Sequence, residues 1–248
     1  MDLSFQLYSA RNFQPWSKVF AALADYGYAQ VEGFGGMFDQ PDQLAELLKT
    51  TSLRMDSAHF GLDQLEDDFD NSLAIIKQLG IKSVFCPYLD EADRPNSVAG
   101  WETFAQRLAS IGDKLASNHI AFGWHNHDFE FKALDDGQLP MDIILQSAPT
   151  LEWEADIAWV HVGGHNPLDW IEKYKDRMTA IHVKDRAPEG ENLDQDGWCD
   201  VGEGVLNWQE ILDAVRSKTN VKIFCVEHDN PADAFAFAQN SFNNIQKF

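Results

Sequence analysis

Several segments of this 248-residue sequence share one pattern, in which a short apolar run ends in histidine or carboxylate side chains. The pattern is clearest in residues 121–131, Ala-Phe-Gly-Trp-His-Asn-His-Asp-Phe-Glu-Phe. It recurs in residues 57–59, 152–156, 181–185 and 224–229. A buried strand whose carboxyl end opens into a polar site has this pattern. Because all five segments place their polar residues at the same end, we expect parallel strands whose carboxyl ends meet.

Strand-like and helical segments alternate along the whole chain. The predicted strands are 3–7, 29–33, 53–59, 82–87, 120–127, 151–156, 178–184 and 222–227. The first predicted helix begins at Pro15, and five more span 42–49, 64–79, 98–116, 141–147 and 167–174. Another follows Asn207, and the last runs from Asn230-Pro231 to about Asn243. Residues 186–206 have no periodicity and are expected to be a loop.

Eight alternations in a chain of this length favour one α/β domain, residues 1–248, folded as a closed (β/α)8 TIM barrel. An open doubly wound sheet is the alternative. Its dinucleotide-binding loop is missing, because Gly33-Phe34-Gly35-Gly36 is not followed by a third glycine in register.

The composition narrows the choice of partners. A formal net charge of -21 disfavours nucleic acid and anionic membrane surfaces. Three scattered cysteines indicate neither a disulfide framework nor a cysteine metal cluster. The N-terminus does not resemble a signal peptide, and no apolar run is long enough to span a membrane. We therefore expect a cytoplasmic protein.

Three candidate metal ligands end neighbouring strands at the active end of the predicted barrel. Asp156, His182 and Glu227 end strands six, seven and eight, where TIM barrels carry their active sites. Carboxylate and imidazole ligands together suit a divalent metal ion. Taken singly, such an aspartate more often caps a helix and such a histidine is more often a hydrogen-bonded core residue, but the three together favour a metal site.

Further candidates surround these three. His125 and His127 share one face of strand five, Glu130 follows it, and His59 ends strand three. These residues either take part directly or orient the ligands. Lys184 shares the face of His182 and is suited to bind an anionic or enolate oxygen, or to pair with an aspartate. Trp159 either packs in the core or forms an apolar wall for a sugar.

These motifs resemble the sugar phosphate isomerase/epimerase family of xylose-isomerase-like TIM barrels, which includes D-tagatose 3-epimerase, hydroxypyruvate isomerase, inosose dehydratase and endonuclease IV. The resemblance lies in residues 125–131, Asp156 with Trp159, residues 182–185, Gly202-Glu203-Gly204 before Asn207-Trp208, and Val226-Glu227. Two positions depart from the epimerases: Trp159 stands in place of a histidine, and Pro188 in place of an arginine.

The resemblance implies one divalent ion, with Mn²⁺ favoured and Mg²⁺, Co²⁺ or Zn²⁺ as alternatives. The implied ligands are Glu130, Asp156, His182 and Glu227. An alignment of strand five without an insertion places His125 at the position of Glu130. The preference for manganese rests on the majority of oxygen ligands.

The implied function is a metal-dependent isomerase or epimerase that abstracts a proton next to the carbonyl of a sugar or sugar phosphate. Glu130 and Glu227 would exchange acid and base roles, and the substrate would contact His59, His125, His127, Trp159 and Lys184. A lyase acting on a keto-polyol or 3-keto-glycoside is the alternative, and a metal-stabilised binding protein is the third hypothesis. The expected partner is a small carbohydrate, and a homo-oligomer is left open.

Overall fold

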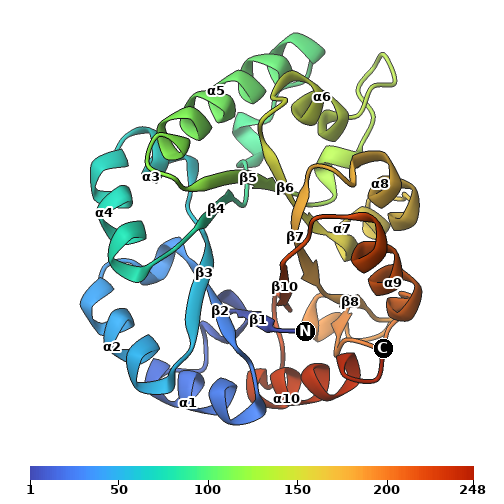
Figure 1. The fold of residues 1–248 in the computed structure, drawn as a ribbon. Helices are drawn as coiled ribbons and strands as arrows, with labels where there is room; N and C mark the ends of the chain where they lie inside the picture. The colour runs from blue at the N-terminus through green and yellow to red at the C-terminus, as the bar shows by residue number, and fades with distance from the viewer.

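Eight parallel strands close into a barrel in the computed structural model, which describes all 248 residues (Figure 1). The order around the barrel is β1-β2-β3-β4-β5-β6-β7-β10, and β10 pairs with β1 to close it. The strands are β1 (Leu3–Gln6), β2 (Gln30–Phe34), β3 (Arg54–His59), β4 (Ser83–Cys86), β5 (Ala121–His125), β6 (Glu152–Asp156), β7 (Met178–Val183) and β10 (Ile223–Val226). The predicted (β/α)8 barrel is confirmed.

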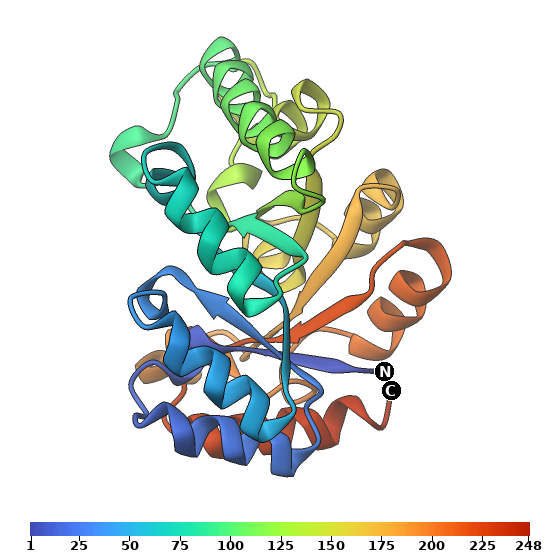
Figure 2. The same cartoon turned by 60° about the vertical axis from the view of Figure 1, so that its left-hand side comes forward.

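Helices surround the strands on the outside, and the two chain ends lie close together (Figures 1 and 2). The helices are α1 (Trp16–Tyr26), α2 (Pro41–Thr51), α3 (Leu62–Glu66), α4 (Phe69–Leu79), α5 (Val98–Ala116), α6 (Pro140–Ser147), α7 (Ile157–Val162), α8 (Pro167–Tyr174), α9 (Trp208–Lys218) and α10 (Ala234–Ile245). Short 3-10 turns are η1 (Leu7–Ala10), η2 (Gly35–Met37), η3 (Glu91–Asp93), η4 (Phe129–Phe131) and η5 (Leu193–Gln195). None of the helices combines the length and the apolar character that a membrane crossing requires.

Two apolar clusters lie on opposite faces of the strands. The larger comprises 62 buried residues packed between the strands and the helices, and the smaller comprises Phe85, Ala180, Ile223 and Cys225. On β5, Trp124 packs outward against Phe104 of α5, with ring centroids 5.3 Å apart. Because side chains alternate along a strand, its neighbours Gly123 and His125 face inward.

The barrel interior is tightly filled below its polar end. A Cβ atom at Gly123 would lie 2.7 Å from the Phe85 ring, so only glycine leaves room for that ring. The smaller apolar cluster, which includes Phe85, therefore fills the middle of the barrel. The polar side chains at the carboxyl ends of the strands lie above it.

Two predicted helices begin elsewhere than the sequence suggested. The segment 64–79 is divided into α3 and α4, and α4 begins directly after Asp68 with Asp70 in its first turn. Asp68 and Asp70 therefore lie at the start of α4, where the helix dipole favours acidic side chains. The last helix does not begin at Asn230-Pro231, because Asp233 accepts hydrogen bonds from the amides of Phe235 and Ala236 and caps α10 there.

The predicted loop 186–206 contains regular structure. Its β9 (Trp198–Cys199) pairs antiparallel with β8 (Asp185–Arg186), and η5 lies between them. Helix α7 was not predicted, since its six residues are too short to show a helical repeat. Both features border the polar end of the barrel.

Candidate metal centre and substrate cavity

The carboxyl ends of the strands bring acidic and imidazole side chains to one place. β3 ends at His59, β5 at His125 and β6 at Asp156, while Glu227 directly follows β10. All of the central residues are buried: Glu32, His59, His125, Glu154, Asp156, His182, Lys184 and Glu227. Burying so many ionisable groups is costly unless they pair with one another or hold a metal.

An outer group consists of His125, Asp156, His182 and Glu227, whose potential ligand atoms all lie within 4.8 Å of one another. His182 Nδ1 lies 2.8 Å from Glu227 Oε2. His125 Nδ1 and Asp156 Oδ2 are buried without a hydrogen-bond partner. Buried polar atoms nearly always have a hydrogen-bond partner. Two potential metal-ligand atoms without one, on two neighbouring residues, are what a cation site would provide.

Asp156 serves two purposes with its two oxygens. Oδ1 accepts a hydrogen bond of 2.9 Å from the amide of Trp159 and caps α7. Oδ2 has no hydrogen-bond partner and lies 3.7 Å from Lys184 Nζ. Burial raises the pKa of Asp156 to about 7, although the charge of Lys184 opposes the shift. The helix cap and the candidate ligand are therefore the same residue.

An inner group, His59, His125, Glu154 and His182, lies next to the outer one and shares two histidines with it. His59 Nε2 is 2.6 Å from Glu154 Oε2. His125 Nδ1 is 3.2 Å from the same oxygen, but not in hydrogen-bond geometry. Glu154 lies two residues before Asp156, so both face the barrel interior.

Glu32 completes this inner layer from the opposite side of the barrel. Its Oε1 lies 2.8 Å from His182 Nε2 and accepts a 2.9 Å hydrogen bond from Gln6, while Ser57 donates to Oε2. Burial disfavours a charged His182, but Glu154 and Glu227 outweigh burial and raise its pKa well above the usual value. Both nitrogens of His182 are thus held by carboxylates, one on each side.

Glu130 does not join these groups. Its two oxygens accept hydrogen bonds from Trp124 Nε1 at 2.8 Å and from the amide of His127 at 2.9 Å. Burial raises the pKa of Glu130 to about 8. Since Trp124 faces the helices, η4 directs Glu130 to the outer side of β5, away from the barrel axis. His125 lies where Glu130 was expected.

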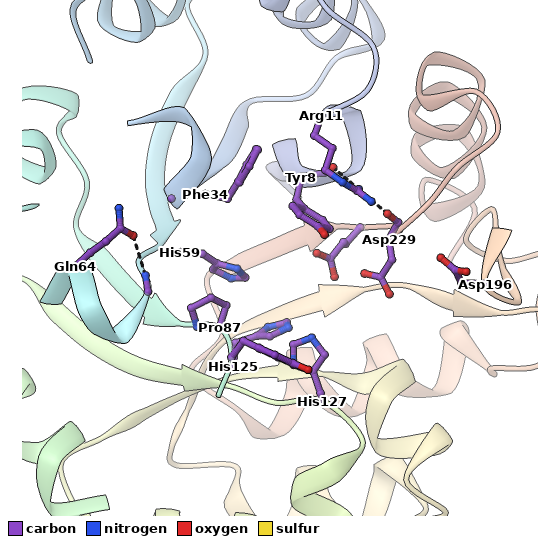
Figure 3. Close-up of a pocket in the computed structure, with 14 residues that line it drawn as sticks. Tyr8, Arg11, Phe34, His59, Gln64, Pro87, His125, His127, Asp196 and Asp229 are labelled. Atoms are coloured by element: carbon purple, nitrogen blue, oxygen red, sulfur yellow. Dashed lines mark hydrogen bonds between the residues drawn. The ribbon is translucent and has the colours of Figure 1, made fainter. Parts of the chain in front are cut away.

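A cavity of about 530 Å³ opens above the outer group. Of the predicted substrate-binding residues, His59, His125 and His127 line it (Figure 3). The predicted ligand Glu227 lines it as well. Lys184 and Trp159 are not among the lining residues. Lys184 is completely buried, with its Nζ 5.1 Å from the Trp159 ring, so both residues stand behind the wall of the cavity.

Several lining residues were not predicted. Tyr8, Arg11 and Phe34 form part of the cavity entrance (Figure 3). The exposed Tyr88 also lines the cavity, as does Asp229, two residues after Glu227. Tyr8 follows β1 and Tyr88 follows β4 as closely as His127 follows β5. The same reasoning from strand ends would have found them, had it included aromatic residues as well as metal ligands.

The fold and the site together define the class of protein. It is a (β/α)8 barrel with a buried imidazole-carboxylate centre at the carboxyl ends of its strands. The family model of xylose isomerase-like TIM barrels matches residues 20–245. The chain belongs to this family. No curated protein matches the sequence.

Solved structures with this fold include several enzymes. A sugar phosphate isomerase/epimerase from Parabacteroides distasonis superposes with a TM-score of 0.82 at 19% identity, over 97% of this chain and 92% of that one. The probable 3-DHS dehydratase AsbF from Bacillus anthracis has a TM-score of 0.77 at 14% identity, over 99% of both chains. The IolI protein, solved with a zinc atom, has a TM-score of 0.76 at 15% identity, over 100% of this chain and 96% of that one. At these identities the likeness shows the fold.

Proposed function

We propose that this protein is a metal-dependent isomerase or epimerase that moves a proton on a sugar carbon next to a carbonyl. The observation that supports this most is the outer group, His125, Asp156, His182 and Glu227, at the base of the cavity. A divalent cation bound there would supply Lewis-acid stabilisation of the negative charge that develops on the sugar oxygens. The remaining work falls to the side chains around it.

The proposed ligand set contains His125 in place of Glu130, which changes the metal preference. Two imidazoles and two carboxylates no longer give oxygen the majority on which manganese was favoured. Imidazole ligands suit zinc, and carboxylates suit manganese and magnesium. The zinc atom bound in the structure of the IolI protein, which has the same fold, supports a bound metal. We therefore propose a divalent transition metal, with zinc and manganese as the two candidates.

Glu227 is the proposed base. Its Oε2 accepts hydrogen bonds from the side chains of His182 and Lys184, and Oε1 has no hydrogen bond within the protein. Burial favours the neutral acid, but Lys184 and His182 outweigh it and hold the pKa of Glu227 well below its usual range. An ionised carboxylate with one free oxygen at the cavity base is suited to take a proton from a substrate carbon.

His127 takes the acid-base role that was predicted for Glu130. It lines the cavity, and its Nδ1 is buried without a partner. Its ring packs between Tyr88 and Trp159, with centroid distances of 5.0 and 5.3 Å. These contacts fix the ring at the cavity wall, where its imidazole would exchange a proton with a bound sugar. Glu227 and His127 come from β10 and β5, so they approach a substrate from different sides.

A lyase remains the second candidate, because abstraction of the same proton also begins a dehydration or the loss of an aglycone. The shared fold of AsbF is the observation that favours it. Product mass separates the two: an isomerase or epimerase retains it, whereas a lyase loses water or an aglycone. A protein that only binds its ligand would incorporate no solvent deuterium into a sugar.

The metal proposal is tested with three alanine variants, two of which, His125→Ala and Glu130→Ala, change the same strand-end segment. After dialysis, His125→Ala and Asp156→Ala should lose the metal that the wild type retains, whereas Glu130→Ala should keep it. Elemental analysis of the purified proteins gives the stoichiometry and identifies the metal. Metal retained in His125→Ala and lost in Glu130→Ala would restore the ligand set expected from the sequence. Equal stoichiometry in the wild type and Asp156→Ala would overturn the site.

A further inference from the structure

The charged side chains that line the cavity are mostly acidic. Asp196, Glu227 and Asp229 contribute three carboxylates, and Arg11 contributes the single guanidinium. Nη1 of Arg11 already donates to two backbone carbonyl oxygens, at 2.9 Å to Tyr8 and 2.6 Å to Asp229 (Figure 3). With Glu227 and Asp156 balancing the charge of the proposed divalent metal, a phosphate group entering this cavity would still meet Asp196, Asp229 and one partly engaged cation.

The nearby Lys184 does not offset the negative charge of the cavity. Lys184 is fully buried, and its Nζ lies 2.6 Å from Asp229, 3.2 Å from Glu227 and 3.7 Å from Asp156. Three carboxylates therefore already share its charge. A substrate phosphate would have to replace these internal partners, which would leave buried carboxylates unpaired.

One of the two loops that usually bind phosphate in a TIM barrel is also occupied from within. Such barrels often bind phosphate with backbone amides of the loops after strands seven and eight. After β7, the amides of Gly202, Gly204 and Leu206 donate to the carboxylate of Asp185 at 2.9, 3.2 and 3.2 Å. A Cβ atom on Gly204 would lie 2.2 Å from Asp185 Oδ1, so the loop is wrapped closely around this anion. Asp185 thus uses the donors that a phosphate would need.

The entrance offers aromatic surface instead. Tyr8, beyond β1, and Phe34, at the end of β2, pack edge to face with ring centroids 5.4 Å apart. Tyr88 and His127, beyond β4 and β5, pack at 5.0 Å. Because β1 and β5 are opposite each other in the barrel, the two pairs lie on opposite sides of the cavity. Figure 3 shows His127 across the cavity from Tyr8 and Phe34.

The two tyrosines are exposed in a way that core residues are not. Tyr8 is 38% and Tyr88 is 43% exposed, and together they are two of the five large hydrophobic side chains that are exposed in the molecule. Tyrosine presents an apolar ring and a polar hydroxyl, which match the C–H face and the hydroxyl edge of a sugar.

We infer that the substrate is an uncharged, unphosphorylated sugar whose ring lies between the Tyr8–Phe34 pair and the Tyr88–His127 pair. That this sugar is a substrate and not only a ligand rests on the proposed function. The inference sets this chain apart from an enzyme that grips a sugar through its phosphate.

The test is equilibrium binding to the purified, metal-loaded protein, measured by calorimetry and ligand-observed NMR. The probes are D-fructose and D-tagatose, each compared with its 6-phosphate, and sucrose as an uncharged disaccharide. At least one uncharged probe should bind, any such hexose about tenfold or more tighter than its phosphate ester, and inorganic phosphate should not displace it. Tighter binding of a phosphate ester, or no binding by any uncharged probe, overturns the inference.

Variants locate the binding to the aromatic pairs. Tyr8→Ala and Tyr88→Ala should each weaken sugar binding about tenfold, whereas Tyr8→Phe, which keeps the ring, should weaken it less. Leu193→Ala is the matched control, since Leu193 is also exposed but does not line the cavity. Equal binding by the wild type and both alanine variants contradicts the aromatic clamp.

The same samples separate this inference from the proposed function. A protein that binds an uncharged sugar but neither converts it nor incorporates solvent deuterium would end the proposed function and leave the ligand class standing. A protein that converts only phosphate esters would do the reverse.

Discussion

The floor and the entrance of the cavity are built on different principles. The floor consists of fully buried carboxylates and histidines whose partners come from across the barrel, such as Glu32 beside His182 at 2.8 Å. The entrance consists of half-exposed aromatic rings that pack in pairs, such as Tyr8 with Phe34. Floor residues hold one another in place, whereas entrance residues have surface left for a ligand.

This difference predicts which substitutions change metal binding and turnover and which change sugar binding. Changes in the floor are expected to alter metal binding and turnover together, because each floor residue contacts another. Changes at the entrance residues Tyr8, Phe34 and Tyr88 are expected to alter sugar affinity alone. The predictions below test that division, beginning with the largest expected effect.

Glu227→Gln is expected to reduce turnover by about 10²–10⁴-fold, because it removes the proposed base while keeping the shape of the side chain. The measurement is the rate of sugar conversion and of solvent-deuterium incorporation at the carbon next to the carbonyl, with metal supplied in excess. Tyr8→Phe provides the comparison from the entrance and should retain much more activity. Full activity in Glu227→Gln would contradict the proposal that this floor residue is the base.

Glu32→Gln is expected to weaken metal binding by about 10–100-fold, since carboxylates that orient a ligating histidine typically contribute that much. Glu32 contacts His182 but is not itself in the outer group. Titration with a competing chelator gives the affinity, and the exposed Glu46→Gln is the matched control. Unchanged affinity would mean that His182 is held well enough by Glu227 alone.

Glu130→Gln should have the smallest effect on metal binding and turnover. Its effect is expected in the pH dependence of the free energy of unfolding. The folded pKa of Glu130, about 8, lies above the ordinary value of 4.5, so its proton stabilises the folded state. This contribution is complete below pH 4.5 and is lost as the pH rises through 8. The wild type should therefore lose unfolding free energy relative to Glu130→Gln between pH 5 and pH 8. Chemical denaturation across this range tests it, and parallel curves for the two proteins would contradict a buried, protonated Glu130.

Much of the floor was predictable from the sequence because strands impose a rule. Side chains alternate along a strand, so His125, Asp156 and His182 were placed on inward faces at strand ends without knowledge of the fold. The structure brings these three together with Glu227. Glu154 follows the same rule, but the prediction passed over it in favour of Asp156.

Residues beyond the strand ends could not be placed in this way. Once the chain leaves the strand, its direction depends on packing, and Glu130 turns outward because the buried Trp124 Nε1 and the His127 amide are both donors in need of an acceptor. The aromatic entrance was missed for a related reason. A tyrosine in a sequence reads equally well as core, and only its 38% or 43% exposure distinguishes it.

The sequence by itself determined the eightfold alternation, and with it the barrel and the collection of polar residues at one end, because apolar periodicity and strand-end chemistry are local properties. Tertiary structure alone decided that His125 and not Glu130 joins Asp156, His182 and Glu227, and that Glu32 supports a histidine 150 positions away. Those outcomes depend on which donors and acceptors meet when the barrel closes, and no local segment of the chain carries that information.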